Sequence, residues 1–334
     1  MIINQWYIAC LEDELKVQNP LKKKICGEEL VIFRTESGKI SVIEDRCCHR
    51  NVNLSLGYIQ GENIKCGYHG WEYNCDGKCV RIPSLSNEER IPAGAKVKAY
   101  TVIIKHRCVW VWIGEDARID ESLIPPMSEM DEYPMVYNYH FIDADLQLVA
   151  ESLFDAYHIN HVHRNSIKGM MGALKDERMD FNMQVSENAI VGNYFRDNDR
   201  TLFEKYYFGF NKKVETYFGF WFPNISKLDI RFKKRRMVIY EHFYQVDDRL
   251  VCMCQITLWK NILDLFPPFA RWFMLRKSIN IVREDIAFLE NNKRIKAETG
   301  AKDLLIKSDE VTFEFIKLWK RKTTTHEKLA EKED

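Results

Sequence analysis

Two cysteine–histidine pairs lie near the start of the chain and offer four metal ligands in a fixed rhythm. Cys47-x-His49 is followed, after 16 intervening residues, by Cys66-x-x-His69. Two thiolates and two imidazoles suit a [2Fe–2S] cluster that has two cysteines on one iron and two histidines on the other. Tetrahedral zinc is the alternative for the same four residues. Zinc fingers usually place their cysteines together and their histidines together, whereas each pair here mixes the two types.

A second group of ligand-type residues follows about a hundred residues later. Glu151, Asp155, His158, His161 and His163 fall within one short stretch. Three histidines within six residues, behind two carboxylates, are hard to explain as core filling. Two histidines and one carboxylate form a facial triad that leaves open coordination positions on ferrous iron for O₂. The stretch therefore predicts a mononuclear iron site.

Helical periodicity does not settle which two histidines bind this metal. At about 100° per residue, His158 and His161 lie about 60° apart on a regular helix and would chelate easily. His158 and His163 lie about 140° apart, so they need a widened or terminated turn near Asn160. Such distortions often mark functional sites. Periodicity alone favours His161 over His163.

The composition is that of an ordinary globular protein. The 334 residues are 46% hydrophobic and 29% charged, with 49 basic and 49 acidic residues. Zero net charge gives no reason to expect binding to nucleic acid or to an acidic membrane. Ten cysteines in a chain of this length do not make a disulfide scaffold, and neither a signal peptide nor an 18-residue apolar run is visible. We expect a cytoplasmic protein.

The hydrophobic pattern predicts an α+β protein with two domains. Residues 1–115 contain many short strands between turn signals, which predicts an antiparallel all-β domain. The expected strands are Leu30–Arg34, Lys39–Asp45, Ile64–Cys66, Trp71–Asn74, Cys79–Ile82, Thr101–Lys105 and Val109–Ile113.

A linker is expected over Gly114–Pro126, and residues 116–322 form the second domain. A helix over Asp143–His163 precedes a second antiparallel sheet, and two helices over Ala270–Thr299 and Ser308–Arg321 follow it. The polar residues 323–334 are predicted to be a disordered tail. The expected strands of this sheet are 189–196, 203–210, 214–222, 226–233, 237–246 and 250–259.

The flanks of the first two pairs resemble a known family. Arg46-Cys47-Cys48-His49-Arg50 and Gly67-Tyr68-His69-Gly70-Trp71 resemble the two loops of Rieske proteins, although those loops more often have proline where Cys48 stands. The resemblance implies that Cys47, His49, Cys66 and His69 hold a Rieske [2Fe–2S] cluster. Neutral imidazole ligands raise the reduction potential of such a cluster.

The second group resembles the iron motif of Rieske non-haem iron oxygenases. Asp155-Ala-Tyr-His158-x₄-His163 is similar to the family pattern Asp-x-x-His-x₄-His. This resemblance covers nearly the whole chain and implies a helix-grip-like catalytic domain with His158 and His163 as the Fe(II) ligands. Glu284-Asp285-x₄-Glu290 resembles the family's C-terminal helix. It implies that Asp285 is the third ligand, with Glu284 as the alternative.

The same resemblance implies how electrons reach the iron. Asp155 resembles the family's bridging acid, which links an iron-ligating histidine of one subunit to a cluster-ligating histidine of the next. A head-to-tail homotrimer is therefore expected. No G-x-G-x-x-G is present, so a separate reductase using NAD(P)H, with or without a ferredoxin, must supply electrons.

The resemblance also implies a reaction class. The chain is similar to the α-subunit-only monooxygenases of the vanillate and toluene-sulfonate O-demethylase type. We expect O₂-dependent hydroxylation or O/N-demethylation of an apolar aromatic or alicyclic compound. Desaturation of a steroid or tetrapyrrole-like compound, and a Rieske electron carrier without catalytic iron, are the alternatives. The expected pocket residues are Phe195, Phe218, Phe220, Trp221, Phe243 and Met253.

Overall fold

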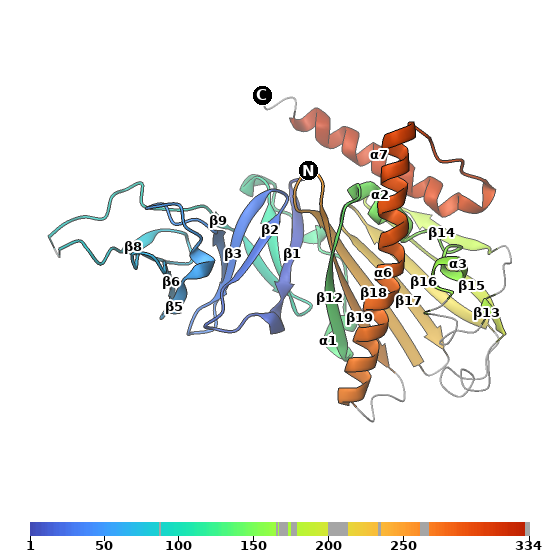
Figure 1. The fold of residues 1–334 in the computed structure, drawn as a ribbon, viewed down its shortest axis with the longest axis horizontal. Helices are drawn as coiled ribbons and strands as arrows, with labels where there is room; N and C mark the ends of the chain where they lie inside the picture. Colours follow the sequence, from blue (N-terminus) through green and yellow to red (C-terminus); the bar gives the residue numbers. More distant parts are fainter. Residues whose placement is uncertain are drawn as a thin grey trace. The chain divides into compact units, whose positions relative to one another are not determined.

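The fold is known from a computed structural model (Figure 1), which describes residues 1–86, 88–164, 166, 173–174, 179–199, 213–232, 235–260 and 267–330. The chain divides into two compact units, Met1–Pro126 and Met127–Asp334. The division falls at the end of the expected linker rather than at 115–116. One reason is local: the indole of Trp6 donates a hydrogen bond to the carbonyl of Asp120 at 2.9 Å, which ties the linker to the first unit.

The first unit is built from three antiparallel sheets. One has the order β1(Gln5–Leu11)-β11(Cys108–Ile113)-β10(Val102–Lys105), and another β2(Leu21–Ile25)-β3(Glu28–Arg34)-β4(Ile40–Glu44)-β9(Ala99–Tyr100). The third is β5(Tyr58–Gln60)-β6(Asn63–Lys65)-β7(Glu72–Tyr73)-β8(Cys79–Arg81). Short 3₁₀ turns are η1(Glu12–Glu14), η2(Leu54–Leu56), η3(Asp116–Arg118) and η4(Glu121–Leu123).

The third sheet positions the two cysteine–histidine loops. The first loop follows β4, and the second joins β6 to β7. Backbone hydrogen bonds close the second loop, from Cys66 to Trp71 and from Gly70 back to Cys66. Gly70 has a φ of 72°, and a Cβ on Gly67 would lie 2.8 Å from the carbonyl oxygen of Leu56. Glycine is needed at both positions for the loop to close this tightly.

The second unit is an eight-stranded antiparallel sheet covered by helices. Its strand order is β12(Met135–Ile142)-β19(Val251–Lys260)-β18(Arg235–Gln245)-β17(Ile225–Phe232)-β16(Lys213–Trp221)-β15(Ala189–Asp199)-β13(Ala173–Leu174), and β14(Phe181–Val185) pairs with β15. The helices are α1(Glu129–Glu132), α2(Leu146–Ser152), α3(Ile159–Val162), α6(Pro267–Thr299) and α7(Glu310–Ala330), with the 3₁₀ turn η6(Lys307–Asp309).

Helix α6 lies across one face of this sheet (Figure 1). Ala270 and Met274 of α6 are buried in one apolar cluster with Val136 of β12 and Trp259 of β19. This contact fixes the start of a long helix against the edge of the sheet. The position of every later residue on α6 follows from it.

The structure confirms the predicted α+β class with an all-β first part and a second antiparallel sheet covered by helices. The prediction of one continuous helix over Asp143–His163 is wrong, because α2 ends at Ser152 and α3 begins at Ile159. The Asp155 carboxylate explains the break: its Oδ1 accepts hydrogen bonds from the backbone N–H groups of Tyr157 and His158. Such side-chain bonds compete with helical ones. The strand expected at 203–210 lies outside the described residues.

The predicted disordered tail is also corrected. Helix α7 continues to Ala330, through most of the segment 323–334. That stretch has no glycine or proline up to Ala330, so no helix-breaking residue ends α7 before that point. None of the helices that the structure describes is long and apolar enough to cross a membrane.

Aromatic side chains join the sheet to α7. Phe220 of β16 is fully buried, and its ring lies 5.0 Å from that of Phe315 of α7, centroid to centroid. It also stacks on Phe243 of β18 at 6.3 Å. These rings form a core layer between the sheet and the helix.

We therefore expect Phe220→Ala to lower the free energy of unfolding by about 3–5 kcal/mol, because it removes a large ring from a packed core. Urea unfolding followed by circular dichroism measures the change. Phe195→Ala is the matched control, since Phe195 is 54% exposed on the neighbouring strand; its effect should stay within about 0.5 kcal/mol. Equal losses in the two variants would contradict this account of the core.

Candidate metal centres

The two cysteines of the Cys-His pairs, Cys47 and Cys66, belong to one apolar core cluster of the first unit. Cys47 and Cys66 are buried, and the Cys47 Sγ lies 3.1 Å from the hydroxyl of Tyr73. Burial raises the pKa of the Cys66 thiol, and the neighbouring Cys47 adds to the rise, although backbone N–H groups of Tyr68 and His69 oppose it. Those N–H groups point at sulfur, as they do in second shells that stabilise a thiolate bound to metal.

The two imidazoles of this site are adjacent. The ring centroids of His49 and His69 are 4.6 Å apart, and His49 stacks on Trp71 with an angle of 5° between the ring planes. Desolvation lowers the pKa of His49, and the nearby His69 and Arg50 lower it further. Its Nδ1 is buried and has no hydrogen-bond partner among the described residues. Two buried thiols and two adjacent imidazoles, one with an unsatisfied nitrogen, fit a Cys₂His₂ [2Fe–2S] cluster.

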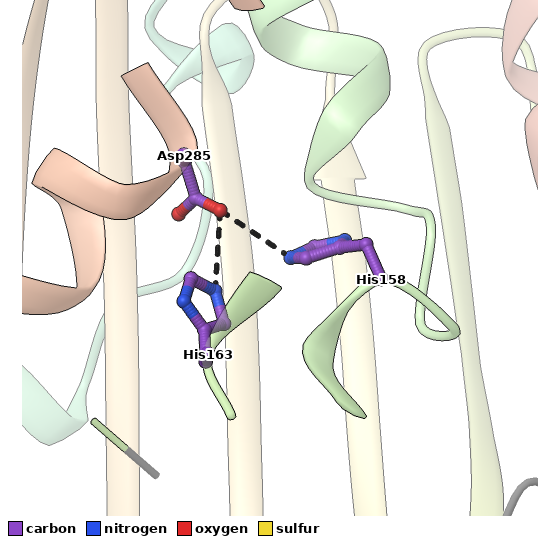
Figure 2. A group of neighbouring side chains, drawn as sticks. All are labelled: His158, His163 and Asp285. Atoms are coloured by element: carbon purple, nitrogen blue, oxygen red, sulfur yellow. Dashed lines mark ion pairs between the residues drawn. The ribbon is translucent and has the colours of Figure 1, made fainter. Parts of the chain in front are cut away.

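The second group of ligand-type residues converges on one carboxylate oxygen (Figure 2). The Oδ1 of Asp285 lies 3.6 Å from Nε2 of His158 and 3.2 Å from Nε2 of His163. One ligand atom from each residue lies within 4.8 Å of the other two. Asp285 comes from α6, and the histidines lie at the two ends of α3. Two imidazoles and one carboxylate in this arrangement fit a facial triad for ferrous iron.

The shortness of α3 explains why His158 and His163 meet. The helix spans only Ile159–Val162, and His163 leaves it with φ −93° and ψ 17°. The angle of about 140° expected on a regular helix therefore does not apply. His161 is exposed and lies outside the group. The structure brings together the pair that the family resemblance implied and not the pair that periodicity favoured.

Glu284, the alternative third ligand in the sequence analysis, contacts His163 and not the centre of the ligand group. Its Oε2 lies 2.9 Å from Nδ1 of His163, and its Oε1 accepts a hydrogen bond from the hydroxyl of Ser166 at 2.8 Å. Glu284 therefore holds the side of the imidazole opposite to the nitrogen that faces Asp285. Metal-binding histidines usually donate their second N–H to such a carboxylate. Sequence reasoning saw the acidic pair but missed this division of roles.

The two histidines differ in their electrostatics. Burial lowers the pKa of His158, and the nearby Asp285 only partly offsets this. Burial also acts to lower the pKa of His163, but Asp285 and Glu284 together raise it above its ordinary value. Without a cation, His163 is thus held by two carboxylates. A bound metal ion would take over the charge balance with Asp285.

Asp155 lies beside this group rather than in it. Its Oδ1 accepts the backbone N–H of His158 at 3.3 Å, and its Oδ2 is 3.9 Å from Nδ1 of the same residue. The side chain is 47% exposed. Asp155 thus sets the backbone of the first histidine, and its carboxylate is still half-exposed at the surface of its unit.

An apolar cavity of about 130 Å³ adjoins the group. His158, His163 and Asp285 line it, together with apolar residues of the sheet and helices that include Phe181, Phe218, Leu228, Ile230, Met237, Ile239 and Ile281. Phe218 is the one expected pocket residue on this wall among those described. Phe220 packs against Phe315 of α7 and stacks on Phe243, Phe195 is exposed, and Trp221 and Met253 do not line the cavity. Strand alternation explains part of this, since only side chains on one face of the sheet reach the cavity.

One acidic side chain of the sheet also lines this cavity. Glu241 of β18 accepts hydrogen bonds from Gln255 at 3.0 Å and Ser226 at 2.9 Å. Burial raises the pKa of its carboxyl to about 7; the bonds from Gln255 and Ser226 oppose the rise, and Asp285 adds to it. No sequence signal distinguished Glu241 from the other acidic residues.

The raised pKa of Glu241 predicts a pH-dependent gain in stability for Glu241→Gln. The folded pKa of about 7 lies above the ordinary value of 4.5, so ionisation opposes folding. This penalty is absent below 4.5 and complete above 7, where it reaches roughly 3 kcal/mol. In protein without iron, the variant should match the wild type at about pH 5 and melt at a higher temperature at about pH 8. A melting difference that is independent of pH would contradict the raised pKa.

The chain is similar to known proteins in sequence and in fold. Residues 5–101 match the Rieske [2Fe-2S] domain family. The chain is 32% identical over 198 residues to a vanillate O-demethylase oxygenase subunit from Pseudomonas sp. (strain HR199 / DSM 7063), covering 58% of this chain and 53% of the relative. It is 33% identical over 169 residues to a putative toluene-4-sulfonate monooxygenase system iron-sulfur subunit from Comamonas testosteroni, covering 50% and 48%.

These matches span about half the length of the curated relatives, and both names denote one component of a larger enzyme system. The crystal structure of dicamba monooxygenase bound to dicamba shares the fold, with a TM-score of 0.82 over 97% of this chain and 99% of the other at 20% identity. The protein is therefore a relative of the oxygenase subunits of Rieske systems, with a Rieske [2Fe–2S] domain in its first unit and the fold of dicamba monooxygenase over nearly its whole length.

Proposed function

We propose that this protein is a Rieske-type monooxygenase that uses O₂ to hydroxylate, or to O- or N-demethylate, an apolar aromatic or alicyclic compound. One observation carries the proposal. His158, His163 and Asp285 converge on the wall of an apolar cavity, in a chain whose other unit is a Rieske domain. The relatives named as an O-demethylase and a monooxygenase component support the same reaction class.

The proposal assigns ligands to both metal centres. Cys47, His49, Cys66 and His69 would hold the cluster, and the facial group would hold ferrous iron. When bound, the cluster supplies single electrons and the iron supplies the binding and activation of O₂. A facial group of two histidines and one carboxylate would hold the iron and leave coordination positions for O₂ beside the substrate cavity.

The residues around the iron site prepare it for this chemistry. Glu284 would accept a hydrogen bond from the Nδ1–H of His163, which leaves Nε2 unprotonated and directed at the metal. Asp155 fixes the start of α3, so that His158 faces Asp285 across the site. Apolar side chains such as Phe218 and Ile230 line the rest of the cavity and favour an apolar substrate over water.

Electrons must come from outside the chain under this proposal. A separate reductase that oxidises NAD(P)H, directly or through a ferredoxin, would reduce the cluster. A homotrimer would then bring the cluster of one subunit to the iron of the next, with the exposed Asp155 carboxylate as the link between them. We also propose a cytoplasmic location, because NAD(P)H is available there and cysteine thiols are kept reduced.

A single turnover tests the proposed reaction. Chemically reduced, iron-loaded protein receives O₂ and a pool of methoxyarenes, plain aromatics and polycyclic apolar compounds, and mass spectrometry identifies the products. Gain of one oxygen indicates hydroxylation, loss of CH₂ demethylation, and loss of two hydrogens desaturation. Only two irons per chain after loading, with no product across the whole pool, would speak for an electron carrier and against the proposal.

Asp285→Ala should remove the mononuclear iron and leave the cluster intact. The variant loses the one anionic ligand at the centre of the group, so iron analysis should fall from about three to about two atoms per chain. Turnover should be lost while the visible spectrum of the cluster stays unchanged. Glu298→Ala is the control on the same helix, since Glu298 is an exposed partner of Arg294. Retained turnover in Asp285→Ala would refute the ligand assignment.

Glu284→Gln should weaken iron binding without abolishing it. The variant keeps the shape of the side chain but removes the charge that holds Nδ1 of His163. Loss of such a partner typically costs about 10- to 100-fold in metal affinity. Competition with a chelator measures the affinity, and Glu298→Gln on the same helix provides the control. An affinity as low as that of Asp285→Ala would mean that Glu284 is itself a ligand.

A further inference from the structure

A row of polar side chains crosses the apolar wall of the cavity. Gln255 of β19, Glu241 of β18 and Ser226 of β17 are direct cross-strand partners in the sheet. Their side chains lie on the face that lines the cavity, beside the apolar Leu228 and Ile239. An apolar pocket with a few placed polar groups is how small-molecule sites fix the orientation of a ligand.

Hydrogen bonds fix the direction in which this row donates. The hydroxyl of Ser278 on α6 accepts from the amide of Asn138 at 2.8 Å and donates to the Oε1 of Gln255. The amide nitrogen of Gln255 therefore points at Glu241 and donates to its Oε1 at 3.0 Å. Ser226 donates to the other oxygen at 2.9 Å. Glu241 is thus held as an acceptor, and each oxygen of its carboxylate keeps a further lone pair that can accept from a group in the cavity it lines.

No lysine or arginine of the described lining pairs with Glu241. Lys227 is the one lysine or arginine among the described lining residues. Its ammonium lies on the other face of the sheet, 2.8 Å from Glu129 and 5.3 Å from the ring centre of Tyr240. A carboxyl in an apolar wall is costly unless other groups donate to it. An anionic ligand group beside it would be repelled.

We propose that Glu241 is a specificity-determining residue that accepts a hydrogen bond from a hydroxyl or amino group of the substrate and excludes a carboxylate or sulfonate from that place. The inference rests on the proposed function and narrows its substrate class to apolar alcohols, phenols and amines. Ser226 and Gln255 are positioning residues, because they donate hydrogen bonds that hold the Glu241 carboxylate in place and do not themselves accept from the substrate. The metal-facing end of the cavity would then receive the part of the substrate that reacts.

Binding to the iron-loaded holoprotein without O₂ tests the proposal, with dissociation constants from calorimetry. The probes share one skeleton: 4-methoxybenzyl alcohol, 4-methoxybenzylamine, 4-methoxybenzoate and 4-methoxytoluene. A hydroxysteroid and its methyl ether repeat the comparison on a larger skeleton. We expect the alcohol, the amine or the hydroxysteroid to bind about 10- to 100-fold more tightly than its partner without a donor, as for a hydrogen bond to a charged group. The benzoate should bind most weakly.

Two variants locate the preference. Glu241→Leu removes the acceptor and should abolish the preference for donor-bearing probes, while Glu241→Gln keeps an acceptor oxygen and should weaken the amine more than the alcohol. Ile239→Leu is the matched control on the same strand and wall, and should change all probes alike. Melting temperature and the cluster spectrum check that each variant is folded.

The proposal is overturned if no donor-bearing probe is preferred, including the case in which none binds, or if the preference survives in Glu241→Leu. A single-turnover experiment distinguishes failure of the Glu241 proposal from failure of the proposed oxygenase function. Product formed equally well from donor-free and donor-bearing probes would uphold the oxygenase and refute the role of Glu241. Donor preference without product from any probe would do the reverse.

Discussion

The second unit depends on the approach of one carboxylate to two imidazoles that lie more than a hundred residues earlier in the chain. The Asp285 Oδ1 stands within 3.6 Å of Nε2 on both His158 and His163. Removing a carboxylate from water is unfavourable unless opposite charge or donors surround it. A metal ion bound among the three residues would provide that charge. The rest of the fold therefore has to deliver α6 and α3 to the same point.

Different interactions deliver the two segments. Apolar packing does it for α6, because Ala270 and Met274 are buried against Trp259 and Val136 at the edge of the sheet. Asp285 lies about three helical turns further on, and a helix transmits that anchor with little loss of precision. The position of α3 is set instead by side-chain hydrogen bonds that compete with helical ones. The Asp155 carboxylate accepts hydrogen bonds from backbone donors that a continuous helix would have used, so the helix ends at Ser152 and a new one begins directly after His158.

The cavity lies between the metal-ligand group and one face of the sheet, so side chains from both line it. Alternation along each strand sends one set of side chains toward the helices and the other set away. On β18 this brings Glu241 to the same wall as Ile239 and Met237, while Tyr240 faces Glu129 on the other side. Cross-strand neighbours then supply the donors that a buried carboxyl requires. A polar row of this kind lets an otherwise apolar cavity distinguish between substrates of similar size.

The sequence by itself determined the chemistry of the metal sites. Cysteine and histidine at 47, 49, 66 and 69 predict a Rieske cluster, because ligand types and spacing are local properties of the chain. The α+β class and most of the long strands follow from hydrophobic periodicity, which is also local. The helix break between Ser152 and Ile159 was not predicted, since it depends on the Asp155 carboxylate accepting hydrogen bonds from backbone N–H groups and not from solvent. Glu284 and Asp285 are adjacent acids, and only the packing of α6 decided which faces Nε2 and which faces Nδ1 of His163. Glu241 was invisible in the sequence because its neighbours Ser226 and Gln255 meet it only across the sheet, where the register of three strands brings them side by side.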